Sequence, residues 1–374
     1  MINLFVDAHV FDHGFEGSAS FIHGIYSALV KQYPDQYRVF LGCSNPDKVM
    51  VSFAGLHDFE PVRYASSNRY ARLAFYAPSL IRRTNADWAH FQYFTPLIKS
   101  CRWIVTIHDV LFNDFPQYFP PNYRRVRNLL FPISARRADV LTTVSSYSRE
   151  RIAHWYRVPP DRIAIVPNGV DPAEAISMAV QHPAVAEVLA HVRGYLLCVS
   201  RFEPRKNQTL LLKAFLKGRL WERGLLLVFV GSRTLPSPEF DAMLNSAPEA
   251  MRGAVRLLSN IPHSDLQHLY AEARAAIYPS FAEGFGIPPL EATLRHTPGL
   301  CANTTAMTEF DFLAPFFFEP NSVDDLLRVM MPVLEAPERA HALAVNAAQE
   351  VEHRYSWEIA SKNLHELITR HKLL

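Results

Sequence analysis

The segment from Tyr278 to Ala292, YPSFAEGFGIPPLEA, constrains the fold of this chain more than any other stretch. It follows an apolar run that ends at Ile277 and is compatible with a short buried strand. Two glycines then flank Phe285, and two prolines come next. Because proline suits the first turn of a helix, where its missing N–H would have no partner, the pattern predicts a strand, a glycine turn and a helix that begins near Pro288.

The predicted turn is a candidate anion site. A helix that begins after a glycine turn presents backbone N–H groups without helical partners, and its dipole favours negative charge there. Glu283 precedes the turn and Glu291 lies in the first turns of the helix, so the two carboxylates would flank a bound phosphate. This arrangement suits a ligand with hydroxyl groups on both sides of a diphosphate, as in a sugar nucleotide. A plain strand–helix connection is the alternative, because a short glycine motif has little specificity by itself.

The size and composition of the chain narrow its class. Its 374 residues are enough for two domains with full cores. A hydrophobic content of 49% with 20% charged residues indicates a folded globular protein, and a net charge of +2 argues against a strongly charged partner surface. The four cysteines lie far apart without C-x-x-C spacing, which disfavours a disulfide framework and a zinc site and fits a reducing cytosol. The longest apolar run, Leu225 to Val230, is too short to span a bilayer, and no signal peptide is expected.

A loop with three cations opens the second half of the chain. The apolar segment from Gly194 to Val199 predicts a buried strand, and SRFEPRKN follows it before the next predicted helix. Arg201 and Lys206 can converge on one anion, since arginine offers a planar fork for phosphate oxygens and lysine a point charge. Arg205 adds a charge without an assigned role, and solvated surface charge is the alternative for all three.

A histidine stands at the end of another predicted strand. The segment from Trp103 to Ile107 is almost wholly apolar and leads directly into His108 and Asp109. The carboxyl end of a buried strand faces the crevice where open α/β sheets bind ligands. Imidazole placed there can bond a sugar hydroxyl or stabilise charge near neutral pH, although a His–Asp pair also occurs in purely structural roles. Asp109 is a candidate to orient His108 or to contact an acceptor hydroxyl.

Two stretches mix arginines with aromatic and aliphatic residues, from Ser66 to Arg83 and from Tyr123 to Arg137. Such a mixture is found in nucleic-acid surfaces and in helices that lie at a membrane interface. No RNA-binding signature accompanies the arginines, so no nucleic-acid partner is expected. An ordinary solvated helix with an apolar inner face explains the same pattern.

The segment EGFGIPPLEA resembles the E-x7-E signature of retaining glycosyltransferases of family 4 nearly letter for letter. The segments TIHD, PNGVD, SRFEPRKN and TPGLCANTTAMTE resemble further parts of the same family, SRFEPRKN matching its G-R-x4-K segment with Ser200 in place of glycine. His296 and Gly299 depart from the usual residues. The resemblance implies an α/β protein of the GT-B class, with two Rossmann-like, doubly wound domains facing a central cleft. It implies an acceptor-binding domain over 1–172, a nucleotide-sugar-binding domain over 173–354 that begins with a helical connector, and a terminal helix over 355–374 that crosses back to the first domain.

The resemblance also assigns roles to residues. The residues implied to take part in catalysis are His108, Glu283, Arg201 and Lys206. The residues implied to bind the donor are Gly17, Arg201, Lys206, Ile261, Glu283, Gly284, Phe285, Gly286, Ile287 and Glu291. Ser18 and Asp109 are expected near the acceptor, and Gly14 and Gly17 outline the family's first glycine loop. Residues 259–261 are expected to face the nucleobase, and N–H groups of 303–306 to approach the phosphates.

The chemistry implied by the resemblance is transfer of a hexose without a metal or another cofactor. No D-x-D triad stands out, so Arg201, Lys206 and the helix start would meet the charge of the departing nucleoside diphosphate. No second carboxylate suits a double displacement, which favours front-face transfer with retained configuration. The residues of the EGFGIPPLEA and TIHD segments look most like those of bacterial mannosyltransferases of surface polysaccharide assembly. GDP-mannose is therefore the first expected donor, followed by UDP-sugars and dTDP-rhamnose.

The expected acceptor is a glycan, free or linked to polyprenyl diphosphate. We expect a cytoplasmic protein, with Arg82, Arg83, Arg124 and Arg125 as candidates for contact with the inner face of the plasma membrane. Three alternatives remain at this point: a GT-B sugar-nucleotide epimerase, a phosphorylase, and a glycan-binding protein without catalytic activity.

Overall fold

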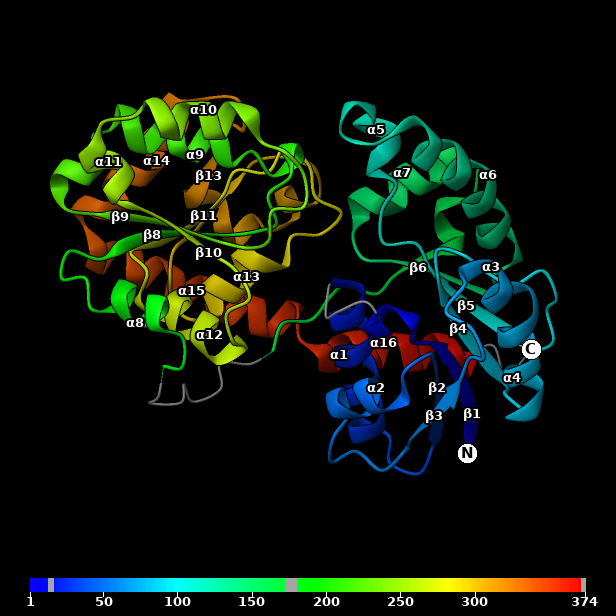
Figure 1. Ribbon diagram of the computed structural model, residues 1–374. Coiled ribbons are helices and arrows are strands. Elements are labelled where there is room, and N and C mark those ends of the chain that lie inside the picture. Colours follow the sequence, from blue (N-terminus) through cyan, green and yellow to red (C-terminus); the bar gives the residue numbers. More distant parts are fainter. Residues whose placement is uncertain (13–16, 172–179, 371–374) are drawn as a thin grey trace. The chain divides into compact units, whose positions relative to one another are not determined.

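The computed structural model describes residues 1–12, 17–171 and 180–370 and divides the chain into two units, which Figure 1 shows. Unit 1 contains Met1–Gly169 and the segment from Tyr355, and unit 2 contains Val170–Arg354. The chain therefore leaves unit 1 at residue 169, where the sequence suggested 172, and returns to it at 355.

Unit 1 is built on a parallel sheet. Within the described residues its seven strands have the order β3-β2-β1-β4-β5-β6-β7. The strands are β1 (Ile2–Asp7), β2 (Tyr37–Cys43), β3 (Phe59–Arg63), β4 (Trp88–Gln92), β5 (Arg102–Thr106), β6 (Val140–Thr143) and β7 (Ile163–Ile165). The helices are α1 (Gly17–Gln32), α2 (Pro46–Ser52), α3 (Arg69–Ala71), α4 (Ala77–Arg83), α5 (Leu111–Asp114), α6 (Pro121–Arg137), α7 (Ser146–Tyr156) and α16 (Trp357–Arg370). The inner strands are buried along nearly their whole length, and they carry buried polar residues such as His90 and Thr142 beside their apolar ones.

Unit 2 repeats this plan. Its six described strands are parallel and have the order β10-β9-β8-β11-β12-β13. They are β8 (Tyr195–Val199), β9 (Leu226–Val230), β10 (Val255–Leu258), β11 (Ala275–Tyr278), β12 (Gly299–Ala302) and β13 (Phe317–Phe318). The helices are α8 (Pro183–Leu189), α9 (Gln208–Lys217), α10 (Pro238–Ser246), α11 (Glu249–Gly253), α12 (His263–Glu272), α13 (Ile287–Leu294), α14 (Val323–Glu335) and α15 (Pro337–Arg354). Helices α9, α10 and α14 lie on one side of the sheet, and α12, α13 and α15 on the other (Figure 1).

The strand order reverses at one point in each sheet. The reversal lies between β1 and β4 in unit 1 and between β8 and β11 in unit 2. In open parallel sheets, ligands bind in the crevice outside the carboxyl ends of the strands at such a point. The loops that follow β8 and β11 are those that carry the cations and the glycine turn, so the topology brings the two strongest sequence motifs to one edge of the sheet.

The terminal helix α16 belongs to the core of unit 1, where it packs along α1 (Figure 1). The indole of Trp357 occupies the space above Gly24, where a Cβ would lie 2.0 Å from its ring. The imidazole of His365 stacks on Tyr33 with the ring centroids 3.7 Å apart and its Nδ1 lies 2.6 Å from the hydroxyl of Tyr37.

One expected element differs. The helical connector predicted from residue 173 lies partly in 172–179, outside the described residues, and the described part contains only the short helix α8. Pro183 occupies the first turn of α8 and fixes where this helix begins. Across the described residues, no helix is both long and apolar enough to cross a membrane.

Candidate active site

The loop between β8 and α9 is fixed to its surroundings by side-chain amides. Asn207 is buried, with φ +55°, and its Nδ2 donates to the carbonyl of Pro279 at 3.0 Å and to that of Pro320 at 2.8 Å. The Nε2 of Gln208 donates to the hydroxyl of Ser200 and to the carbonyl of Arg201. These bonds hold the loop against the strand end that leads into the glycine turn.

The glycine turn has the predicted form. Gly286 has φ +103° and is the N-cap of α13, and a Cβ on it would lie 3.0 Å from the side chain of Met307. A residue with a side chain would therefore be strained at this position. The two prolines that follow have no N–H, so Ile287 is the single donor among the first three helical residues.

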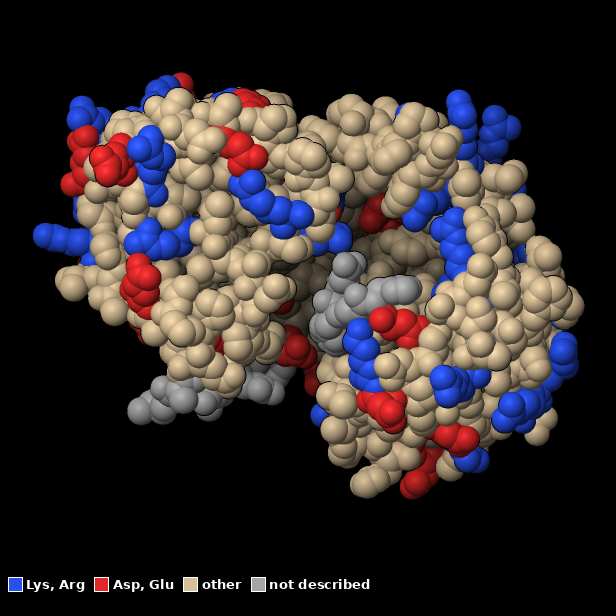
Figure 2. Space-filling view, viewed as in Figure 1, with Lys and Arg blue, Asp and Glu red and all other residues tan. Residues whose placement is uncertain are grey.

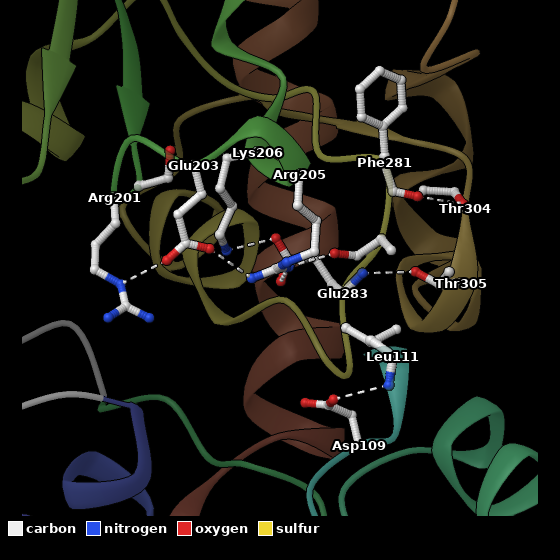
Figure 3. A network of polar contacts seen from close by, with 12 residues as sticks. Asp109, Leu111, Arg201, Glu203, Arg205, Lys206, Phe281, Glu283, Thr304 and Thr305 are labelled. Carbon is white, nitrogen blue, oxygen red and sulfur yellow. Dashed lines mark hydrogen bonds and ion pairs between the residues drawn. The ribbon is translucent and has the colours of Figure 1, made fainter. Parts of the chain in front are cut away.

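Glu283 is the centre of an ion-pair network that Figure 3 shows from close by. One of its oxygens lies 2.7 Å from Nζ of Lys206, and the other lies 2.9 Å from Nη1 of Arg205. The side chains are mostly buried, with exposed fractions of 14% for Glu283 and Arg205 and 17% for Lys206. The backbone N–H of Glu283 donates to Oγ1 of Thr305 at 2.9 Å, so both the backbone and the side chain of Glu283 are held in place.

The network fixes the charge of Glu283. Burial raises its pKa, but the Lys206 ammonium and the Arg205 guanidinium lower it more, so the pKa falls from 4.5 to about 2. Glu283 is therefore an ionised hydrogen-bond acceptor at neutral pH and is unsuited to donate a proton.

Arg205 ties the cation loop to the glycine turn. Its Nη1 also donates to the carbonyl of Ala282 at 2.5 Å, and its own carbonyl accepts from the N–H of Phe281 at 2.9 Å. Arg205, to which the sequence assigned no role, is thus bonded to three consecutive residues at the start of the turn, 281–283. Lys206 and Arg205 both reach Glu283, and the Nε of Arg201 pairs with Glu203.

Arg201 lies at the outer end of the same network. Its side chain is 46% exposed, and its Nε lies 3.3 Å from Glu203. The other oxygen of Glu203 lies 3.4 Å from Nη2 of Arg205. Three cations and two carboxylates thus alternate along the loop and the turn (Figure 3).

A small hollow opens beside this network. Its lining includes Ser200, Lys206, Ser280, Glu283, Gly286 and Met307. The hollow has a volume of about 10 Å³, which is about the space that one water molecule needs. The predicted phosphate turn therefore borders a real concavity, and Lys206 and Glu283 line it together.

Glu291 lies on α13, behind the turn. Its Oε2 accepts a hydrogen bond from the hydroxyl of Tyr270 at 2.8 Å. Burial raises the pKa of Glu291, and the Tyr270 hydroxyl lowers it in part. The two glutamates of the motif thus have opposite environments, one held ionised by cations and one pushed towards protonation by burial.

His108 follows β5 in unit 1 and is buried among aromatic rings. Phe21 meets it edge-on with the ring centroids 4.9 Å apart, and its Nε2 lies 2.7 Å from Oε1 of Gln92. Burial lowers the pKa of His108 to about 4, so the imidazole is neutral near physiological pH. Asp109 accepts at Oδ1 from the N–H of Leu111 at 3.1 Å (Figure 3).

The other predicted residues occupy simpler positions. Gly17 and Ser18 begin α1, and a Cβ on Gly17 would meet none of the described residues within 4 Å. Gly14 lies outside the described residues. Ile261 is half-buried in the loop after β10, and Gly284 and Phe285 are buried in the turn.

The expectation about backbone donors in 303–306 is wrong for three of the four residues. The N–H groups of Asn303, Thr304 and Ala306 donate to the carbonyls of Phe318, Ala302 and Glu283, so they are not directed at a phosphate. Their physical role is to fasten the segment after β12 to the glycine turn and to β13.

Sequence reasoning missed the partners of the site residues. Glu203 and Gln92 had no assigned role, and Tyr270 was not considered. Glu203 lies between two of the cations in the sequence, and this spacing was the available signal for it. Nothing in the sequence indicates Gln92 or Tyr270, because each lies far along the chain from its partner. The described residues contain no group of three or more His, Cys, Asp or Glu side chains arranged to hold a metal ion.

Two family models match the chain. The model described as Glycosyltransferase Family 4 matches residues 16–174, and the model described as Glycosyl transferases group 1 matches residues 186–350. Each model thus falls largely on one of the two units.

Two named bacterial proteins are similar in sequence. O-antigen chain mannosyltransferase B of Escherichia coli is 31% identical over 285 residues, which cover 73% of this chain and 71% of that protein. O-antigen chain mannosyltransferase RfbU of Salmonella typhimurium is 27% identical over 217 residues, covering 57% of this chain and 55% of that protein.

The fold is also found in solved structures. The Anabaena protein HepE, solved in complex with UDP and glucose, has a TM-score of 0.72 and 16% identity, covering 99% of this chain and 100% of that chain. The two parallel-sheet units, the E-x7-E turn and these matches together lead to one conclusion: the chain belongs to glycosyltransferase family 4 and has the GT-B fold.

Proposed function

We propose that this glycosyltransferase moves mannose from GDP-mannose to a glycan or a polyprenyl-diphosphate-linked glycan during surface polysaccharide synthesis, with retention of configuration. The names of the two bacterial relatives support the sugar and the pathway class. The observation that carries the proposal is the cluster of Arg201, Arg205 and Lys206 with Glu203 and Glu283, which joins the loop after β8 to the glycine turn after β11.

The cluster supplies charge stabilisation for the departing group. Cleavage of the bond between the sugar and the diphosphate leaves additional negative charge on the nucleoside diphosphate. Arg201 is half exposed, Lys206 lines the hollow, and the N-terminus of α13 adds the positive end of its dipole. Positive groups that already lie where this charge will develop lower the reaction barrier, because they need not reorganise during the reaction. In this proposal the residues themselves meet the charge and the transfer needs no metal ion.

The two carboxylates and the histidine hold the donor. Glu283, ionised at neutral pH, accepts hydrogen bonds from hydroxyl groups of the sugar, and Glu291 accepts from the ribose. His108 is neutral and contacts the sugar from unit 1. With the amide of Gln92 oriented as in the structure, Nε2 of His108 is the donor to Gln92, and Nδ1 carries the lone pair that a sugar hydroxyl can use.

Unit 1 would bind the acceptor, with Asp109 and Ser18 as candidates for contact. An acceptor linked to polyprenyl diphosphate lies in a membrane, so we place the protein at the inner face of the plasma membrane. Of the four arginines predicted to touch that membrane, Arg82, Arg83 and Arg125 are exposed, whereas Arg124 is half-buried.

Nucleotide binding is the first test. In a thermal-shift panel of nucleoside diphosphates and sugar nucleotides, GDP and GDP-mannose should give the largest stabilisation, because a ligand that binds only the folded protein raises its melting temperature. Arg201→Ala and Glu283→Ala should abolish the shift. Arg219→Ala is the matched control, because Arg219 is an exposed, paired arginine of the same unit. Absence of any nucleotide-dependent shift, or variants that keep full affinity, would leave a glycan-binding protein as the better description.

Product analysis is the second test. Transfer from GDP-mannose to a soluble acceptor should give an α-linked product, and NMR of the anomeric proton identifies the configuration. Release of an epimerised sugar nucleotide without transfer to the acceptor would indicate an epimerase. A strict need for inorganic phosphate would indicate a phosphorylase.

A further inference from the structure

Unit 1 carries a polar cluster of its own at the carboxyl end of β1. Asp7 is the last residue of this strand, and its side chain is 3% exposed. Its Oδ1 accepts a hydrogen bond from the hydroxyl of Tyr64 at 2.9 Å and lies 3.1 Å from Nδ1 of His9. Its Oδ2 lies 3.5 Å from Nε of Arg72. Side chains from three parts of the chain thus converge on one buried carboxylate.

Two local features bring partners to this carboxylate. Gly42, in β2, leaves the room that the Tyr64 hydroxyl occupies, because a Cβ on it would lie 2.4 Å from that oxygen. Arg72 opens a short π-helix, Arg72–Tyr76, which ends where the N–H of Ala77 donates to the carbonyl of Arg72. Single π-turns inside helices occur frequently at functional sites. The side chain of Arg72 is directed into the unit, since it is only 7% exposed.

Stability alone does not account for this cluster. Burying a carboxylate and a guanidinium costs free energy, which their attraction repays only when the geometry is good and the hydrogen bonds are complete. Within the described residues, the buried Nε of Arg72 has no hydrogen-bond partner. Burial raises the pKa of Asp7, but the charges of His9 and Arg72 and the hydrogen bonds to Asp7 lower it more. This pKa therefore lies well below its usual range, and the cluster keeps a buried negative charge beside His9.

His9 is the most exposed member of the cluster. Its side chain is 24% exposed, whereas its Nδ1 atom is buried beside Asp7. The exposed part is therefore the opposite edge of the ring, which carries Nε2. In the neutral imidazole, the charge of Asp7 favours the tautomer with the proton on Nδ1, which leaves a lone pair on Nε2. The buried groups thus hold His9 with a hydrogen-bond acceptor facing outwards.

The position of His9 in the sheet points to a ligand of unit 1. It follows β1 at the carboxyl edge, beside the reversal between β1 and β4, where open parallel sheets bind ligands. The ionised carboxylate behind the ring repels an anion, which disfavours a phosphate as the group that His9 contacts. The lone pair on Nε2 requires a hydrogen-bond donor, and a sugar hydroxyl is one.

We infer that Nε2 of His9 accepts a hydrogen bond from a hydroxyl group of the acceptor glycan, and that Asp7 positions His9 for this contact. The inference deepens the proposed function and rests on acceptor binding by unit 1. Tyr64 and Arg72 act through Asp7, which they hold in place and ionised. Changes at His9 should therefore alter the affinity for the acceptor and leave the affinity for the nucleotide unchanged, because the proposed nucleotide site lies in unit 2.

Two variants of His9 separate this contact from a structural role. A glutamine side chain places its amide where His9 has Nε2, and an asparagine side chain places it where His9 has Nδ1. H9Q therefore keeps an outward hydrogen-bonding group, whereas H9N keeps only the contact with Asp7. The probe is a p-nitrophenyl mannotrioside, used as the acceptor in transfer from GDP-mannose and as the ligand in calorimetric titration. We expect H9N to raise its KM and its dissociation constant roughly two- to tenfold, the range of one hydrogen bond, and H9Q to stay close to the unchanged protein.

Further measurements guard against indirect effects. His57 is an exposed histidine of the same unit, so H57Q is the matched control and should bind the mannotrioside like the unchanged protein. All variants should bind GDP with the affinity of the unchanged protein. In ¹⁵N spectra of protein labelled at histidine, the neutral ring of His9 should carry its proton on Nδ1, and D7N should weaken this preference.

Three results would overturn the inference: H9N that binds the mannotrioside as tightly as the unchanged protein, H9Q that is impaired as much as H9N or more, or a neutral His9 that carries its proton on Nε2. A chain that binds GDP but not the mannotrioside would overturn it as well. A chain that binds the mannotrioside but not GDP would count against the proposed transferase instead, and the two His9 variants would still decide whether His9 makes the contact.

Discussion

Glu203 gives the sharpest prediction for the donor site, because removing its charge should strengthen the binding of a nucleoside diphosphate. Its carboxylate lies 3.3 Å from Nε of Arg201, the outermost cation of the network. A diphosphate that binds Arg201 must compete with this carboxylate and is also repelled by it. Both effects disappear in Glu203→Gln, which keeps the shape of the side chain.

The size of the effect follows from the exposure of the pair. Two unit charges 3.3 Å apart interact by about 1.3 kcal/mol at the dielectric constant of water. Because the Arg201 side chain is 46% exposed, the measured range for exposed pairs, roughly 0.2–1 kcal/mol, is the better guide. A gain of about 0.5–1 kcal/mol corresponds to a dissociation constant lower by roughly two- to fivefold.

Calorimetric titration of GDP into the purified protein measures this gain. Glu239→Gln is the control, because Glu239 forms an exposed ion pair with Lys213 at 2.6 Å in the same unit, and its removal changes the net charge equally. The gain in Glu203→Gln should shrink at high salt. An affinity that is unchanged or weaker in Glu203→Gln, relative to the control, would refute the reasoning and would mean that Glu203 prepares Arg201 for the ligand.

Three further variants probe the surrounding groups. Arg205→Met should raise the pKa of Glu283 from about 2 towards 4.5, and each unit of rise removes about 1.4 kcal/mol of stability. A carboxylate whose pKa is lowered by folding stabilises the protein above the pKa of the unfolded chain, and this stabilisation is lost as the pH falls through the pKa of the folded protein. The difference in melting temperature between Arg205→Met and the unchanged protein should therefore narrow as the pH falls from neutrality through 4.5 towards 2. A difference that stays constant would contradict this role of Arg205. Tyr270→Phe removes a hydrogen bond that lowers the pKa of Glu291, so this pKa should rise further. In calorimetric titrations at several pH values, the affinity of the variant for GDP should therefore begin to fall at a higher pH than that of the unchanged protein. Asp265→Ala should lower the melting temperature by the equivalent of about 2 kcal/mol, because this fully buried carboxylate accepts from two backbone N–H groups, and an equal melting temperature would exclude that role.

The parts of the fold that the sequence predicts well are the inner strands and the glycine turn. The expected strand over Gly194–Val199 and the helix expected near Pro288 agree with β8 and α13 to within one residue. Strands buried on both faces are rich in apolar residues, as β8 is, and a turn with positive φ followed by a helix favours glycine and then tolerates proline. These constraints are local, so the sequence carries them directly.

The contacts that complete the site are not local. Which cations reach Glu283 depends on how the loop after β8 meets a turn almost eighty residues later, and within this loop the sequence shows only three similar cations. Arg72 shows the same limit, because it belongs to a stretch that resembles a basic surface, yet it is buried with its Nε 3.5 Å from Asp7. In α6 the apolar residues occupy both sides of the helix, and periodicity alone does not tell which side faces the core.

The return of the chain to unit 1 at Tyr355 has a consequence for synthesis on the ribosome. Unit 2 is continuous in sequence, so all of its parts are available once residue 354 has emerged. Unit 1 lacks α16 until residues 357–370 have been made, and until then the site beside Gly24 that receives Trp357 stays open to water. The amino-terminal half is made first, but it reaches its final packing last, and a nascent chain that stops before residue 355 exposes the apolar face of α1 to chaperones and proteases.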